Sequence, residues 1–181
     1  MSNARRAFAA NPVAALLATG FGSGLSPIMP GTAGSVVGLV IGWFGARALA
    51  LHAGSIGVSV GLLTSGLLIG LAGVVASEPV CRALGEKDPG CVVIDEIAGQ
   101  LIASAAVPLL APHPSPPVAA GSWIASFVLF RFYDIAKPGP IHGLQKLPGG
   151  WGVVVDDVAG GIAAAATLLA AGWLATRLGW I

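Results

Sequence analysis

Apolar residues fall into five runs along the chain, and short polar segments separate them. The runs cover residues 33–51, 56–76, 97–111, 118–130 and 158–176. A helix that crosses the hydrocarbon core of a bilayer needs roughly 20 residues, and 56–76 and 158–176 approach or reach that length without a charged residue. The runs 97–111 and 118–130 are shorter, so we expect both helices to continue into the polar segments beside them.

This pattern predicts an all-α fold, a compact multi-helix integral membrane bundle with about five apolar helices, and one domain over residues 1–181. At the N-terminus, Arg5 and Arg6 precede an apolar stretch that Asn11-Pro12 interrupts, which predicts a short retained helix near the membrane interface. Charged residues are 9% of the chain, against roughly 25% in soluble domains, and hydrophobic residues are 55%. This composition excludes a soluble globule, and the net charge of +1 gives no support to a nucleic-acid partner.

The distribution of charge predicts how the bundle is oriented. If the spans alternate, the loops 52–55 and 112–117 share one side of the membrane and contain no Lys or Arg. Seven of the nine basic residues and all eight acids then lie on the other side. The positive-inside rule makes that side cytoplasmic, so the polar motifs and any chemistry are expected to face the cytoplasm.

Two segments repeat one pattern of apolar residues followed by an acidic pair. Residues 92–99 contain Asp95-Glu96, and residues 153–160 contain Asp156-Asp157, 61 positions further on. Each pair opens an apolar helix, and the Ala-Gly that follows would let the two helix starts approach closely. Helix capping explains one acid per helix, whereas two adjacent carboxylates repel each other. The paired acids therefore favour a divalent cation, and oxygen ligands without a matching His or Cys suit Mg²⁺ or Mn²⁺.

A third cluster follows the run 118–130. If that helix continues, Arg131, Asp134 and Lys137 share one face at spacings of three residues. They could form a ladder of salt bridges, or they could supply an Arg fork, a Lys charge and a metal-binding oxygen to a phosphate monoester.

A fourth polar segment, residues 20–35, is rich in Gly, Ser and Thr and opens the first long helix. Backbone N–H groups and hydroxyls in such a loop can bind an anion, although similar loops also serve as ordinary membrane entries. The residues that could contact a phosphate here are Ser26, Gly31 and Thr32.

These four segments together resemble the phosphatidylglycerophosphatase A family. The similarity rests on GFGSGLSPIMPGTAGS, DPGCVVIDEIAG, LFRFYDIAKPGPI and GGWGVVVDDVAGG, in that order. It implies an all-helical enzyme of the bacterial inner membrane that removes the terminal phosphate of phosphatidylglycerophosphate with Mg²⁺.

By the same resemblance, the catalytic and metal-binding acids are Asp95, Glu96, Asp134, Asp156 and Asp157, with Asp88 as an outlying member. The implied phosphate ligands are Arg131, Lys137, Ser26, Gly31 and Thr32, with Pro30 in the same loop motif. His142, Cys81 and Cys91 match nothing in the motifs and inherit no role.

Two other functions stay open at this point. A small transporter or ion-conducting protein would line its pathway with buried acids, but it would place them at mid-membrane depth. A phosphatase that acts on another lipid phosphate would share the same motifs. For a lipid substrate, we expect the acyl chains to lie between the helices 97–111 and 118–130.

Overall fold

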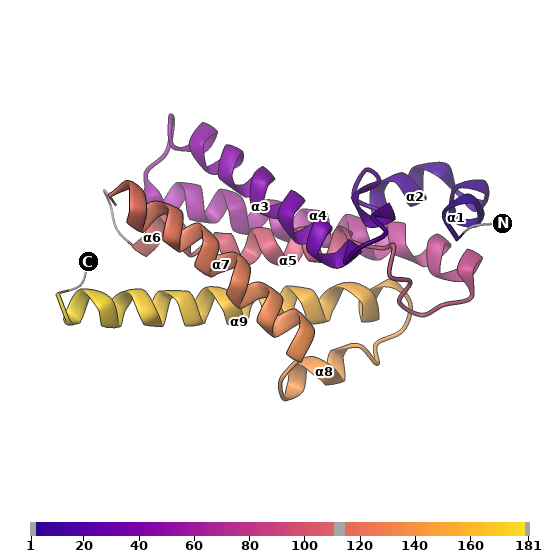
Figure 1. Ribbon diagram of the computed structural model, residues 1–181. Helices are drawn as coiled ribbons and strands as arrows, with labels where there is room; N and C mark the ends of the chain where they lie inside the picture. The colour runs from indigo at the N-terminus through magenta and orange to yellow at the C-terminus, as the bar shows by residue number, and fades with distance from the viewer. Residues whose placement is uncertain (1–2, 111–114, 180–181) are drawn as a thin grey trace.

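The structure is a computed structural model that describes residues 3–110 and 115–179, and these residues contain helices and no strands. Part of the predicted outer loop 112–117 lies outside the described residues. The helices are α1 (Asn3–Ala10), α2 (Pro12–Ala18), the 3₁₀ turn η1 (Ser23–Leu25), α3 (Pro30–Leu49), α4 (Ser55–Leu84), α5 (Ile94–Ser104), α6 (Val107–Leu110), α7 (Pro116–Ala136), α8 (Pro140–Leu144) and α9 (Gly150–Arg177). The all-α prediction is therefore confirmed (Figure 1).

Four helices, α3, α4, α7 and α9, are long and apolar enough to cross a membrane. Large apolar side chains cover their outer surfaces, as at Phe44, Leu68 and Ile124, which are each at least 61% exposed. An apolar surface of this size is unfavourable in contact with water, whereas the acyl chains of a bilayer would cover it. At a rise of ~1.5 Å per residue, α4 is about 45 Å long and exceeds the ~30 Å hydrocarbon core, so it extends beyond the core by several turns.

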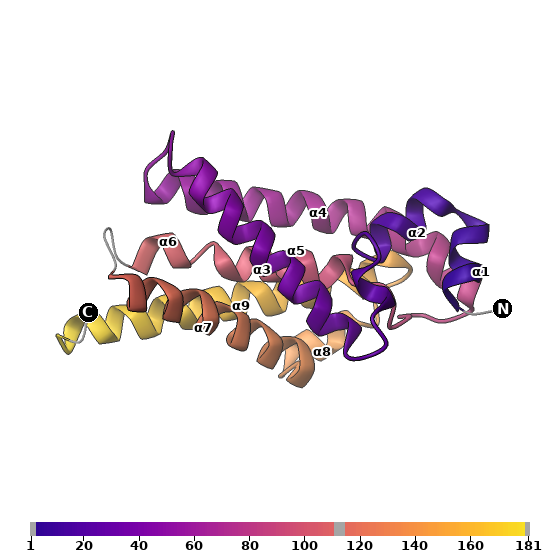
Figure 2. The same ribbon diagram turned by 45° about the horizontal axis from the view of Figure 1, so that its top comes forward.

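The fifth apolar helix, α5, lies in the centre of the bundle and packs against α3, α4, α7 and α9 (Figures 1 and 2). Ten of its eleven residues are buried, and only Glu96 is half-buried. The limits that the sequence predicted for this helix, 97–111, were wrong. The helix begins at Ile94, ends at Ser104 and resumes briefly as α6. Because protein rather than lipid surrounds α5, it needs no membrane-spanning length.

The other limits explain where the polar motifs lie. The helix predicted at 118–130 does continue, as α7, through Arg131 and Asp134. The last long helix, α9, begins at Gly150, well before the predicted 158, so Asp156 and Asp157 lie inside it and not at its start.

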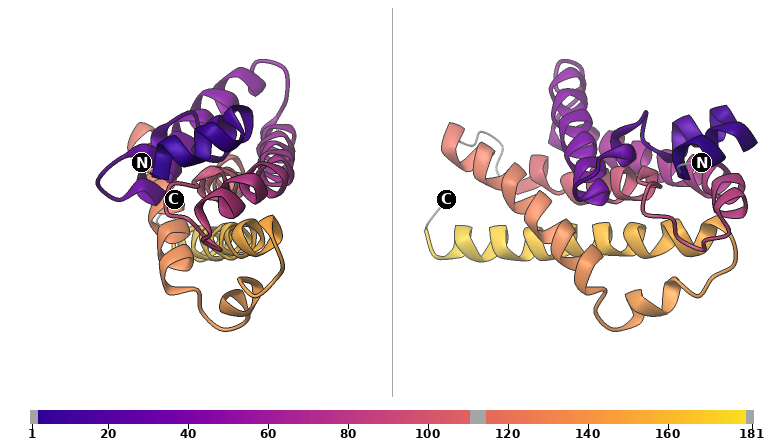
Figure 3. Two further views of the ribbon diagram at one scale, coloured as in Figure 1. Left: turned by 90° about the vertical axis from the view of Figure 1, so that its right-hand side faces the viewer. Right: turned by 45° about the vertical axis from the view of Figure 1, so that its right-hand side comes forward.

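The N-terminal region forms two short helices, α1 and α2, where one was predicted. Pro12 begins α2, and the Asn11 side chain accepts a hydrogen bond of 3.0 Å from the Ala14 N–H, which caps the second helix. Both helices pack against the C-terminal part of α4 at one end of the bundle (Figures 1 and 3). Arg6 donates to the Ala83 carbonyl at 2.9 Å and holds α1 there.

Candidate functional site

The predicted polar motifs meet at the end of the bundle where α3, α5 and α9 begin and α7 ends (Figure 1). Each motif occupies a helix terminus or the first turns of a helix, so alternating helix directions bring all of them to the same side. Five acidic residues lie there: Asp95 and Glu96 on α5, Asp134 on α7, and Asp156 and Asp157 on α9. We call these five residues the acid cluster.

Three of the acids converge closely. One carboxylate oxygen from each of Asp95, Glu96 and Asp157 lies within 4.8 Å of the other two, and Asp95 and Asp157 are buried. Within the described part of the chain, Asp95 Oδ1, Glu96 Oε2 and Asp157 Oδ2 are buried without a hydrogen-bond partner. A buried carboxylate oxygen is costly without a partner, so this group of atoms has the chemistry of a hard-cation site.

The structure does not support helix capping as the role of the acidic pairs. The residue at the N-cap of α5 is Val93, and no side chain caps that terminus. In α9 the acids lie about two turns inside the helix. The free N–H at the start of α9 has a partner from another helix: Glu78 Oε2 of α4 accepts a hydrogen bond of 3.0 Å from the Gly150 N–H.

Arg131 joins α7 to the start of α3. Its guanidinium forms an ion pair with Asp134, as the spacing predicted, and donates to Ser35 Oγ at 3.2 Å. Ser35 in turn donates to the Gly31 carbonyl at 2.9 Å. The Arg131 Nε is buried and has no partner among the described residues, so one donor of the fork remains available.

Lys137 neutralises the other part of the cluster. It terminates α7 with a left-handed φ of +40°. Its Nζ forms an ion pair with Asp156 and lies 3.9 Å from one oxygen each of Asp134 and Asp157. Partial burial lowers the pKa of the ammonium, but the hydrogen bond to Asp156 and the neighbouring carboxylates outweigh this effect and raise the pKa overall. Lys137 is thus charged at neutral pH, and its charge partly neutralises the neighbouring carboxylates of this cluster.

The Gly-rich segment reaches the site through Gly31. A Cβ at this position would overlap Glu96 Oε1 and would lie 3.4 Å from the Arg131 guanidinium, so a larger residue here would displace the Glu96 carboxylate from the start of α3. Ser26, in contrast, donates to the Ile28 carbonyl at 2.8 Å and closes a local turn. Thr32 lies in the first turn of α3 and has no described side-chain hydrogen bond to the acids.

Two polar residues of the site region were not among the predicted site residues, although Ser35 lies in the Gly-rich segment 20–35. Ser35 lies one turn after Gly31 on α3, so the helical spacing could have indicated it. Gln100, one turn after Glu96, is fully buried and donates to Ser104 at 3.0 Å and to Ser126 at 3.4 Å. This network joins α5 to α7 beneath the acid cluster.

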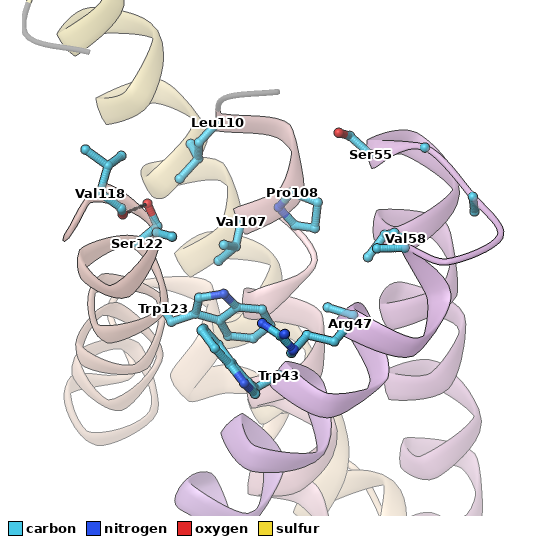
Figure 4. A pocket seen from close by; sticks show the side chains of 15 residues that line it. Trp43, Arg47, Ser55, Val58, Val107, Pro108, Leu110, Val118, Ser122 and Trp123 are labelled. Atoms are coloured by element: carbon cyan, nitrogen blue, oxygen red, sulfur yellow. Dashed lines mark hydrogen bonds between the residues drawn. The ribbon is translucent and has the colours of Figure 1, made fainter. Parts of the chain in front are cut away.

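The space predicted for acyl chains is filled near the acid cluster. Phe130 of α7 is fully buried, and a side chain at Gly99 of α5 would overlap its ring. At the opposite end, α6 and the start of α7 line an apolar pocket of about 570 Å³ with α3 and α4 (Figure 4). Trp43 and Trp123 meet edge to face there at 5.4 Å. The residues that line this pocket include no acid, so it is separate from the candidate site.

Chemically, five carboxylates face two cations, Arg131 and Lys137, in a largely buried site. The excess of negative charge favours a divalent cation, while the Arg131 fork favours an oxyanion such as phosphate.

Asp88 lies at the edge of this site. Desolvation of its carboxyl raises its pKa, and Lys137 partly offsets this effect.

Comparison with known proteins finds relatives that match most of the chain. The Haemophilus influenzae protein named Phosphatidylglycerophosphatase A is 37% identical over 162 residues, which cover 88% of each chain. The Escherichia coli K12 protein of the same name is 34% identical and covers 84% of this chain and 80% of its own. A Bacteroides thetaiotaomicron protein named "Putative phosphatidylinositol-3-phosphatase" is 36% identical and covers 88% and 93%.

No solved structure matches the chain significantly. The family model described as Phosphatidylglycerophosphatase A matches residues 16–172, which include all four polar segments. On this match and on the identity to the curated relatives, the chain belongs to the phosphatidylglycerophosphatase A family.

Proposed function

We propose that this chain hydrolyses the terminal phosphate monoester of phosphatidylglycerophosphate and yields phosphatidylglycerol and inorganic phosphate. The observation that carries the proposal is the convergence of Asp95, Glu96 and Asp157, with the Arg131 guanidinium next to the same Gly31 position as Glu96. A cation site next to a phosphate-binding fork is the arrangement that phosphoryl transfer requires. Family membership gives the substrate class.

We further propose that Asp95, Glu96 and Asp157 would hold Mg²⁺. Their buried oxygens lack hydrogen-bond partners among the described residues, and carboxylate oxygens are the protein ligands that Mg²⁺ prefers. When bound, Mg²⁺ would supply Lewis-acid polarisation of the phosphoryl oxygens and would lower the pKa of a coordinated water. Asp134 and Asp156 were also predicted as ligands, but each pairs with a basic side chain, and we assign them to the arrangement of Arg131 and Lys137.

The chain's own residues then have distinct roles. The Arg131 fork, held by Asp134 and Ser35, directs its free Nε to an oxygen of the transferring phosphoryl group. Lys137 keeps Asp156 and Asp157 in place and offsets their repulsion. In the reaction, water adds its oxygen to phosphorus, the bond from phosphorus to the glycerol oxygen breaks, and that oxygen takes up a proton.

We infer that the protein lies in the bacterial inner membrane with the acid cluster toward the cytoplasm. Four membrane-length helices support a membrane location, and the predicted distribution of Lys and Arg supports the orientation. A single Cys at Ser55, introduced into a chain with Cys81 and Cys91 replaced by Ser, should react with a membrane-impermeant thiol reagent in intact spheroplasts. A Cys at Glu86 in the same background should react only after lysis, and the reverse pattern would overturn the orientation.

The activity is tested by phosphate release from phosphatidylglycerophosphate in detergent micelles. Wild type should release phosphate with Mg²⁺, and EDTA should abolish release. Asp95→Asn should lose about a hundredfold or more in kcat, whereas Glu86→Gln, an exposed acid outside the cluster, should stay near wild type. Full activity in EDTA would contradict the metal assignment, and inactivity of wild type with Mg²⁺ would contradict the function.

A second substrate is favoured by the name of the Bacteroides relative, which refers to a phosphorylated inositol lipid. Phosphate release should therefore be compared across phosphatidylglycerophosphate, phosphatidylinositol 3-phosphate and phosphatidic acid. We expect the highest kcat/KM on phosphatidylglycerophosphate. The transporter alternative gains no support, because the acids lie in the first turns of α5 and α9 and the last turn of α7, and not in the middle of these helices.

A further inference from the structure

A second, smaller pocket opens beside the acid cluster. It has a volume of about 250 Å³ and is lined by Lys87, Asp88, His142, Gln145, Lys146 and Gly152. Drug-sized ligands occupy pockets of roughly 300–1,000 Å³, so this one suits a small polar group and not an acyl chain. We call it the lysine pocket.

The lysine pocket adjoins the acid cluster through α9. Gly152 lies one helical turn before Asp156 on the same face of α9. A side chain at Gly152 would overlap the Leu147 carbonyl and would meet the Gln145 carbonyl at 2.9 Å, so the glycine lets this wall of the pocket close against α9. Asp88, which lines the pocket, also lies within electrostatic reach of Lys137.

The charge around this corner of the molecule is unusual for the chain. The sequence contains only three lysines, and all of them lie in this region: Lys137 contacts the acid cluster, and Lys87 and Lys146 line the pocket. Neither Lys87 nor Lys146 forms an ion pair with any described residue, in contrast to Lys137. His142 and the Gln145 amide offer further hydrogen-bond donors. Asp88 adds one carboxylate to the lining, and the charges of Lys137 and Lys87 act against it. With two ammonium groups and one carboxylate, the lining keeps a net positive charge, which favours an anion.

From this placement, and on the basis of the proposed function, we propose that the lysine pocket is a second phosphate-binding site that serves the same reaction. Two sources could supply its anion. One is the phosphodiester of the lipid headgroup, which is retained in the product, and the other is the inorganic phosphate that leaves the acid cluster. Both are tetrahedral phosphorus oxyanions, which ammonium groups bind as point charges.

The test uses three variants of the full chain in detergent. Lys87→Gln/Lys146→Gln removes both charges, and Lys87→Arg/Lys146→Arg keeps them. Arg82→Gln is the control: it removes an exposed cation at the same end of the bundle, and Arg82 does not line the pocket. Inhibition by phosphatidylglycerol is followed as phosphate release, and inhibition by inorganic phosphate is followed as phosphatidylglycerol formation.

If the pocket holds the phosphodiester, the double Gln variant should weaken inhibition by phosphatidylglycerol and raise the KM for phosphatidylglycerophosphate, each by about tenfold. If the pocket holds released phosphate, the inhibition constant for inorganic phosphate should rise instead. The Arg pair should behave as wild type in both arms. Less than about a twofold change in both arms, or an equal change in Arg82→Gln, would overturn the proposal.

Binding measured without turnover separates this proposal from the proposed activity. In EDTA, glycerophosphoglycerol and inorganic phosphate are titrated into wild type and the double Gln variant, and ligand NMR line widths report binding. Broadening of either ligand by wild type that the double variant loses supports the pocket, even if no lipid is hydrolysed. Equal broadening by both proteins, or none by wild type, contradicts it.

Discussion

Gly99 of α5 and Gly161 of α9 meet backbone to backbone, one helical turn beyond Asp95 and Asp157. A side chain at Gly161 would overlap the Gly99 carbonyl, and one at Gly99 would lie 2.6 Å from the Asp157 carbonyl. Residues four apart share a helix face, so the glycine contact brings the two acids together above it. The close approach of α5 and α9 thus determines which carboxylates converge.

This contact predicts that Gly161→Ala impairs both folding and the proposed metal site. The added methyl group meets rigid backbone, and overpacking of this kind costs about 1–3 kcal/mol. The Tm in detergent and the kcat for phosphate release should both fall. Gly160→Ala is the matched control, because its methyl group would lie 3.6 Å from Tyr133 Cβ at ordinary contact distance. Equal effects of the two variants would show that the glycine contact does not position the acids.

The sequence indicated the members of the site but not their partners. The two repeats aligned Asp95 with Asp156 and Glu96 with Asp157, yet the structure groups Asp157 with the α5 acids and gives Asp156 to Lys137. Neighbouring residues on a helix point about 100° apart, so the rotation of α9 decides which one faces α5. Gly161, which the repeat did not include, fixes that rotation, and spacing along the chain contains no information about it.

Helix limits failed for a related reason. Apolar runs predicted α7 correctly because its polar residues share one face, but they placed the start of α9 at 158 instead of Gly150. The first turns of α9, which lead to Asp156 and Asp157, are stable because other parts of the protein contact them. A Cβ at Gly150 would overlap the Val74 carbonyl, and the Glu78 side chain accepts the Gly150 N–H. Such contacts between distant segments are invisible to a pattern of hydrophobicity.

Lys137 should be important for stability as well as activity. Lys137→Met leaves the Asp156 side chain, which is 1% exposed, without its counter-ion, and an unpaired buried charge costs about 3–5 kcal/mol. We expect a large loss of thermal stability in detergent. Arg82→Met is the control, because it breaks an exposed pair with Glu78 that contributes less than about 1 kcal/mol. A Lys137→Met protein as stable as Arg82→Met would contradict this role.

Glu78 should act on catalysis from a distance. Glu78→Ala leaves the Gly150 N–H without its acceptor and loosens the first turn of α9, which positions the acids of that helix. The expected loss is about 1–3 kcal/mol of stability, together with a lower kcat and a nearly unchanged KM. Glu78→Gln keeps a carbonyl oxygen for the same bond and should recover most of the activity. Failure of Gln to recover more than Ala would indicate that the charge of Glu78 acts instead.

Cys91 should be a slow nucleophile. Burial raises the pKa of its thiol, with a smaller contribution from Glu86, so less thiolate is present at any given pH than for a free thiol. In the Cys81→Ser variant, alkylation of Cys91 by iodoacetamide at pH 8 should be slower than that of glutathione and should accelerate as the pH rises further. Alkylation at the glutathione rate would contradict the raised pKa. Cys81→Ser/Cys91→Ser should keep wild-type phosphate release.

Arg131 gives the most direct test of phosphate recognition. Its fork already serves Asp134 and Ser35, and the buried Nε remains for a phosphoryl oxygen, so one ammonium group cannot replace it. Arg131→Lys should therefore lose about a hundredfold in kcat/KM despite the retained charge, and Arg131→Gln should lose more. Ser35→Ala removes the 3.2 Å contact with Arg131 and the bond from Ser35 to the Gly31 carbonyl, but it leaves the guanidinium in place, so it should cost about tenfold or less. If Arg131→Lys retains wild-type kcat/KM, charge alone suffices, and the role assigned to Nε is wrong.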